Sequence, residues 1–174
     1  MSQSSRVLIS KSPGTLDQYR RALLSKGSKT KTPKLPSTRI TLRDTKVDPN
    51  RIAQYADVCG FEKDSKVLPI TLPHLLAFPL HLELMLLRDF PFAVMGMVHI
   101  RNEITQHRAI KSFEIMDVTC LFSDIRKTDK GFEIDITTQI HITGSVVWES
   151  ISTNLVRQKT DIAPAEKSKE PSTL

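Results

Sequence analysis

Residues 72–87 read LPHLLAFPLHLELMLL, an apolar run that only two histidines and one glutamate interrupt. Its apolar side chains fall on nearly every side of a helix, which is the pattern of a helix buried all round. Thr71 can cap this helix, and Pro73 falls in the first turn, where its missing N–H costs little. The run is shorter than the ~20 apolar residues that a membrane span needs. The sequence therefore predicts a central helix that other elements must surround, and no membrane span.

Beyond Gly96 the apolar residues recur with a period of two, which is typical of half-buried strands. The clearest case is residues 132–142, FEIDITTQIHI, in which isoleucines alternate with polar residues. Turn residues at 127–131 and 143–144 then predict that the last three long strands form an antiparallel meander. A curved sheet with one apolar face and a helix that is apolar all round bury each other. We therefore expect an α+β fold in which a curved antiparallel sheet wraps a long apolar helix.

The 174 residues suit one domain with short extensions. Residues 39–42 predict a first short strand. Asp48 and Pro49 then predict the start of a helix that Gly60 ends. We place a basic N-terminal arm with a short helix over residues 1–35, the folded domain over 36–158, and a disordered tail, rich in Lys, Glu, Ser and Pro, over 159–174.

The net charge of +6 is concentrated in the arm. Residues 1–35 carry eight basic side chains and one acidic one, so the rest of the chain has a net charge of −1. Such an arm is most often solvated, although it could dock an acidic partner or act as an organellar transit peptide. We expect no nucleic-acid partner, because the folded part is nearly neutral. The two distant cysteines and the absence of a visible secretory signal predict a cytoplasmic protein.

Three segments resemble the MaoC-like family of hot-dog acyl-thioester hydratases and dehydratases. They are residues 55–60, YADVCG; 68–79, LPITLPHLLAFP; and 98–102, VHIRN. The likeness spans about residues 15–157 and is closest to the N-terminal, non-catalytic half of members in which two hot-dog units are fused. The resemblance implies a hot-dog fold and binding of acyl thioesters of coenzyme A or acyl carrier protein. It also implies a dimer, either with itself or with a catalytic hot-dog unit, and no cofactor.

The family's catalytic motif, Ser/Thr-Gly-Asp-x-Asn-Pro-Ile-His, is incomplete in this chain. Cys59 and Gly60 match its start, but Phe61 stands at the position of the aspartate, and no Asn-Pro-Ile-His follows. The chemistry needs a carboxylate and an imidazole that both reach the transferred proton. The resemblance therefore implies a unit that contributes to a (R)-3-hydroxyacyl-thioester dehydratase or enoyl-thioester hydratase, both hydro-lyases, without supplying the acid–base pair.

Two other readings stay open. His74 and a loop carboxylate such as Asp64 are weak catalytic candidates for a homodimeric enzyme that is active by itself. A hot-dog thioesterase is a further alternative, although the central helix has no carboxylate near its start. We see no metal-ligand spacing among the histidines. The residues predicted to contact the acyl thioester are Tyr55, Phe61, His74, Leu75, Phe78, Leu82 and Val98.

Overall fold

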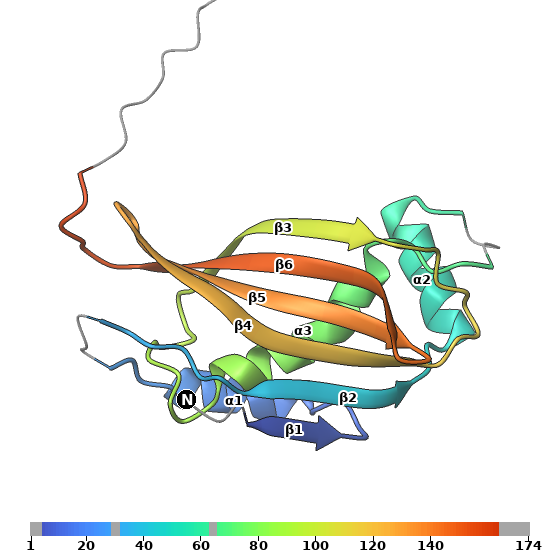
Figure 1. Ribbon diagram of the computed structural model, residues 1–174, viewed down its shortest axis with the longest axis horizontal. Coiled ribbons are helices and arrows are strands. Elements are labelled where there is room, and N and C mark those ends of the chain that lie inside the picture. Colours follow the sequence, from blue (N-terminus) through green and yellow to red (C-terminus); the bar gives the residue numbers. More distant parts are fainter. Residues whose placement is uncertain (1–4, 29–31, 63–65, 164–174) are drawn as a thin grey trace, which may run out of the picture.

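A computed structural model describes residues 5–28, 32–62 and 66–163 of the chain. Along the sequence the elements are β1 (Arg6–Ile9), α1 (Thr15–Leu24), β2 (Arg39–Thr45), α2 (Pro49–Cys59), α3 (Leu72–Met85), β3 (Val98–Gln106), β4 (Met116–Thr128), β5 (Gly131–Ile142) and β6 (Ser145–Arg157). Figure 1 shows one curved sheet lying against α3, with α2 at one end of the molecule. This arrangement confirms the predicted α+β fold.

The sheet has the strand order β1-β2-β4-β5-β6-β3. Its pairings are antiparallel except for β1 with β2, which is parallel. The predicted meander is confirmed as β4-β5-β6, with Thr143 and Gly144 turning at positive φ between β5 and β6. β1 was not predicted, because four residues are too few to show a period of two. It places residues from the basic arm in the same sheet as the rest of the protein.

The inner face of the sheet and one side of α3 form the core. Isoleucines of β5, at 134, 136, 140 and 142, are buried, as the alternation predicts. On α3 the buried residues include Leu72, Leu80 and Leu84, which are inaccessible to solvent. α1 packs on the other side of α3, where Gln18 donates to the Pro79 carbonyl at 2.7 Å and Arg21 pairs with Glu83 at 2.8 Å.

The predicted start and end of α2 are confirmed. The Asp48 side chain accepts a hydrogen bond from the Asn50 N–H, and Pro49 occupies the first turn. Gly60 has φ 73°, the left-handed conformation that ends a helix at low cost for glycine. The expected cap of α3 is wrong, because the Thr71 hydroxyl does not cap the helix and instead lies 2.8 Å from Tyr55 Oη in a hydrogen bond.

Burial of α3 on every side is also not what the structure shows. The side chains of Leu75 and Phe78 are 42% and 43% exposed, on a flank that the described residues leave uncovered. The sheet curls round only part of the helix, and α1 covers another part. The apolar surface of α3 therefore exceeds what the described residues bury. None of the helices in the described residues is long and apolar enough to cross a membrane.

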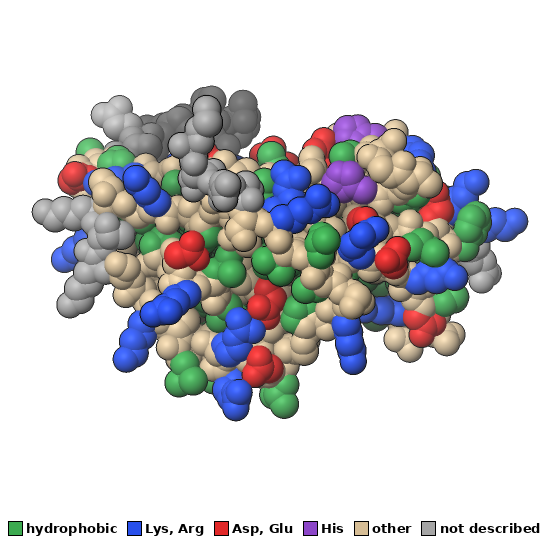
Figure 2. Space-filling view, turned by 60° about the horizontal axis from the view of Figure 1, so that its bottom comes forward, with side chains coloured by type: hydrophobic (Ala, Val, Ile, Leu, Met, Phe, Trp, Pro, Cys, Tyr) green, Lys and Arg blue, Asp and Glu red, His purple; other side chains and the backbone are tan. Residues whose placement is uncertain are grey.

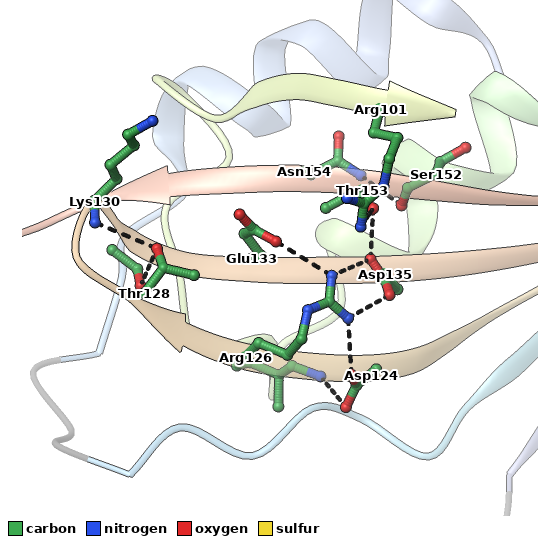
Figure 3. Close-up of polar contacts among 12 residues, drawn as sticks. Arg101, Asp124, Arg126, Thr128, Lys130, Glu133, Asp135, Ser152, Thr153 and Asn154 are labelled. Atoms are coloured by element: carbon green, nitrogen blue, oxygen red, sulfur yellow. Dashed lines mark hydrogen bonds and ion pairs between the residues drawn. The ribbon is translucent and has the colours of Figure 1, made fainter. Parts of the chain in front are cut away.

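The outer face of the sheet carries a polar network that joins four strands (Figure 3). Arg126 on β4 donates through both guanidinium nitrogens to Asp135 on β5. Thr153 on β6 donates to the same carboxylate at 2.7 Å, and Arg101 on β3 donates to the Thr153 hydroxyl at 3.3 Å. Burial by itself raises the pKa of Asp135, but the hydrogen bonds from Arg126 and Thr153 outweigh it and hold this pKa below its ordinary value. Asp135 is thus a buried, ionised centre of the network.

Asp135→Asn is expected to lower the free energy of unfolding by about 2–3 kcal/mol. The substitution removes the negative charge that pairs with Arg126 on β4 and accepts the hydrogen bond from Thr153 on β6. Arg126 is about one-third exposed, so water takes over part of the lost interaction. Asp124→Asn is the matched control, since this more exposed carboxylate also pairs with Arg126. The control should cost less than about 1 kcal/mol. Equal losses in urea denaturation would contradict the special role of Asp135.

Candidate functional site

Three histidines meet where α3 packs against the edge of the sheet. His74 and His81 lie on one stripe of α3, as their spacing by seven predicts, with ring centroids 5.6 Å apart. His99 comes from β3 and stacks on His74, also at 5.6 Å. We refer to these residues as the histidine cluster. The cluster contains His74, the only histidine among the predicted site residues. It places His99, which was not predicted, against the His74 ring.

The cluster continues into the sheet through hydroxyl groups on its inner face. His81 Nε2 lies 2.7 Å from Thr138 Oγ1 in a hydrogen bond, and both side chains are buried. Ser150 lies beside Thr138 on the next strand, and its buried hydroxyl has no hydrogen-bond partner within the described residues. His74 Nδ1 is likewise buried without a partner there. Two unsatisfied polar atoms in one region leave hydrogen-bonding capacity for a water molecule or a polar ligand group.

Burial and the neighbouring imidazoles keep His74 and His81 neutral. Burial, followed by the nearby charges of His74 and His99, lowers the pKa of His81 to about 3. Burial and then His99 lower the pKa of His74 as well. Neutral imidazoles accept or donate a hydrogen bond, so His74 and His81 can hold a polar group but supply no cation at neutral pH.

The other predicted contact residues fall into separate places. Tyr55 stacks on Phe61, with centroids 6.3 Å apart, next to the start of α3. Leu75 and Phe78 lie on the exposed flank of α3, whereas Leu82 is buried in the core. Val98 begins β3 and is 40% exposed. Within the described residues, the structure therefore brings Tyr55 and Phe61 together and places Leu75 and Phe78 on an exposed flank, away from the buried Leu82.

No catalytic acid–base pair is assembled around His74 within the described residues. Its ring contacts are with histidines, and Glu83 is bonded to Gln18 and Arg21 on the other side of α3. Asp64, the other weak catalytic candidate, lies outside the described residues. His107 and Glu149 form a histidine–carboxylate pair at 3.0 Å, but both side chains are exposed. In the part of the chain that the structure describes, no group of three or more His, Cys, Asp or Glu residues is placed to hold a metal ion.

No family model matches the chain. The 3-hydroxyacyl-thioester dehydratase X of Mycobacterium tuberculosis is 33% identical over 137 residues, which make up 79% of this chain and 49% of that protein. The crystal structure of HtdX from the same organism has 32% identity and a TM-score of 0.64, over 69% of this chain and 51% of that one. The chain is a MaoC-like hot-dog domain.

More distant structures share the hot-dog fold. The truncated HadBC (3R)-hydroxyacyl-ACP dehydratase complex of M. tuberculosis has a TM-score of 0.58 at 13% identity, over 72% of this chain and 98% of that one. The domain spans about half the length of the curated relative it matches. Its helix α3 is thus the central helix of a hot-dog unit.

The sequence did not predict that His99 contacts His74 or that the His81 side chain faces the sheet. His81 is buried against Thr138. Heptad spacing shows that two residues share a stripe of a helix, and it does not show which way the stripe faces. The period-two pattern around Val98 identified a strand, but only the pairing of β3 with β6 brings His99 over α3.

Proposed function

We propose that this hot-dog domain binds acyl thioesters and works as the non-catalytic half of a (R)-3-hydroxyacyl-thioester dehydratase or enoyl-thioester hydratase. A second hot-dog unit supplies the acid–base pair. The observation that carries this proposal is Phe61, an apolar residue where the family has its aspartate, in a chain that matches half of a dehydratase. A carboxylate and an imidazole in proton-transfer range are what this chemistry requires.

The free edge of the sheet supports pairing with a second unit. β3 is the last strand in the sheet order, so one side of its backbone lacks a strand partner within the described residues. Ile100 on β3 is exposed, as are Leu75 and Phe78 on α3. An unpaired edge beside exposed apolar side chains is a surface that a partner strand can cover. The partner is a catalytic hot-dog unit, or a second copy of this chain if the domain is active as a homodimer.

The activity is tested by the loss of enoyl absorbance with crotonyl-coenzyme A. The chain alone should turn over at least about 100-fold more slowly than its mixture with a hot-dog unit that carries Gly-Asp-x-Asn-Pro-Ile-His, because general acid–base catalysis contributes ~10²–10⁴. Turnover by the chain alone that disappears in His74→Ala would overturn the proposal and favour the self-sufficient homodimer.

Assembly is tested separately by sedimentation velocity. Ile100→Asp places a charge on the free edge and should weaken association with the catalytic unit by at least about tenfold, since a charge at an apolar contact must be desolvated. Leu23→Asp is the control, because Leu23 is exposed on α1 and lies on another element. If both variants associate like the wild type, β3 is not the pairing edge.

A further inference from the structure

A groove of about 460 Å³ lies on the outer face of the sheet, across β1, β2, β4 and β5. Three arginines line it: Arg6 from β1, and Arg39 and Arg43 from β2. The sheet register explains this gathering. Arg6 is the direct partner of Arg39 in the parallel pair, and residues 39, 41 and 43 share one face of β2 because strand side chains alternate. Figure 2 looks toward the β1–β2 side, where basic side chains stand among acidic ones.

The arginines differ in whether they have a partner. Arg43 pairs with Asp117 at 3.8 Å, and the same carboxylate accepts the Asp44 N–H at 3.0 Å. Arg6 and Arg39 form no ion pair within the described residues. Like charges directly opposite each other on neighbouring strands repel. An anion between these two guanidinium groups would remove that repulsion.

Two buried hydroxyls form part of the same groove. Thr41 and Thr119 are both almost inaccessible, and their hydroxyl oxygens lie 3.0 Å apart in a hydrogen bond. This bond uses one of the two hydroxyl protons. No acceptor for the other proton is present within the described residues, so one hydroxyl can donate into the groove. The groove thus combines two unpaired guanidinium groups with a preformed neutral donor.

A neighbouring groove of about 380 Å³ extends the basic surface and shares Arg43 and Asp44 with the first. It adds Lys11, Lys46 and Arg51. The acidic groups on the two grooves are Asp44, Asp48 and Asp117, of which Asp48 caps α2 and Asp117 pairs with Arg43. The six Lys and Arg side chains on the two grooves therefore exceed the three carboxylates.

We propose that the groove over β1, β2, β4 and β5 binds the phosphate groups of a phosphorylated small molecule. Guanidinium groups match phosphate oxygens with paired hydrogen bonds, and a threonine hydroxyl supplies a further donor. The source of the phosphate is either free inorganic phosphate or an organic phosphate such as coenzyme A. The proposal goes beyond the acyl-thioester function proposed above, because this groove lies on the face of the sheet opposite α3 and the histidine cluster. Only the neighbouring groove reaches α3, at Leu75, Leu76 and Pro79.

Isothermal titration calorimetry of the full chain tests this binding with inorganic phosphate, coenzyme A and pantetheine, which lacks phosphate. We expect a phosphate-bearing ligand to bind and pantetheine not to bind. Arg6→Gln and Arg39→Gln should each weaken binding by about tenfold, the size of a charged hydrogen bond. Arg88→Gln is the matched control, because Arg88 is an exposed arginine that does not line the groove. Thr41→Val combined with Thr119→Val removes the hydroxyl donors while it keeps the branched shape.

The outcomes separate the alternatives. Equal affinity for phosphate and coenzyme A assigns the groove to a single phosphate, whereas tighter binding of coenzyme A assigns it to the nucleotide. Binding that survives both arginine substitutions, or that pantetheine reproduces, overturns the proposal. The proposal is also overturned if neither inorganic phosphate nor coenzyme A binds, even if an acidic protein binds the chain. Circular dichroism of each variant checks that the exposed substitutions leave the fold intact.

Discussion

Trp148→Ala is expected to lower the free energy of unfolding by about 3–5 kcal/mol, the largest effect of any single substitution we consider. Trp148 lies on the inner face of β6 and is 0% exposed. Its removal leaves a cavity between the sheet and the segment before α3, which the close-packed core fills only in part. Its indole N–H also donates to the Ile70 carbonyl at 2.8 Å, two residues before α3 begins. The substitution therefore weakens both the core and the attachment of the central helix.

Trp148→Phe separates these two contributions. It keeps most of the apolar volume and loses the hydrogen bond to Ile70, so we expect a loss of about 1–3 kcal/mol. Phe113→Ala is the control, because Phe113 is exposed, and it should change stability by less than about 1 kcal/mol. Unfolding is followed by far-UV circular dichroism, since Trp148 is the only tryptophan and its fluorescence is lost in both variants. A cost below 1 kcal/mol for Trp148→Ala would contradict the packing that the structure shows.

Acidification is expected to destabilise the domain through His81. The pKa of His81 is about 3 in the folded protein and 6.5 in the unfolded chain. Above pH 6.5 neither state binds the proton, and the stability is fully present. As the pH falls below 6.5, His81 binds a proton in the unfolded chain but stays neutral in the folded protein. The free energy of unfolding therefore decreases progressively down to about pH 3. This amounts to about 2 kcal/mol by pH 5 and about 5 kcal/mol in total.

The measurement is the free energy of unfolding in urea at pH 7 and pH 5, for the wild type and for His81→Gln. The glutamine does not titrate and can still bond Thr138, so the variant should lose about 2 kcal/mol less than the wild type between the two pH values. Titrations of groups remote from His81 cancel in this difference. His81→Asn serves as a second replacement if the glutamine does not fit. Equal losses in the wild type and in a folded variant would show that His81 is not the group responsible.

Local chemistry explains why most of the fold was predictable. The caps of α2 depend on Asp48, Pro49 and Gly60, whose preferences act within a few residues. The strands of the meander depend on a period of two and on turns such as Thr143-Gly144. The Thr71 cap was wrong because a tertiary contact, the hydroxyl of Tyr55, competes for the same side chain. Local preference yields when a partner from another element is available.

The candidate site was predictable only in part. Phe61 and the lack of the motif that follows it were visible in the sequence, and they carry the proposed function. The sequence did not show that His81 is buried or that His99 stacks on His74. It also did not show that Arg6 and Arg39 lie opposite each other on neighbouring strands. Each depends on which strand lies beside which, and no local pattern encodes that order.

The sequence by itself determined the kind of each main element, because hydrophobic spacing, caps and turns act over a few neighbouring residues. It also showed that neither the Asp nor the His of the motif that the resemblance implies is present after Gly60. Only the tertiary structure decided which faces meet. The histidine stripe turns inward, a flank of α3 and one edge of β3 stay uncovered within the described residues, and two arginines from distant segments share one groove. These depend on strand order and on the side of α3 that the sheet covers, which are set by packing of the whole chain.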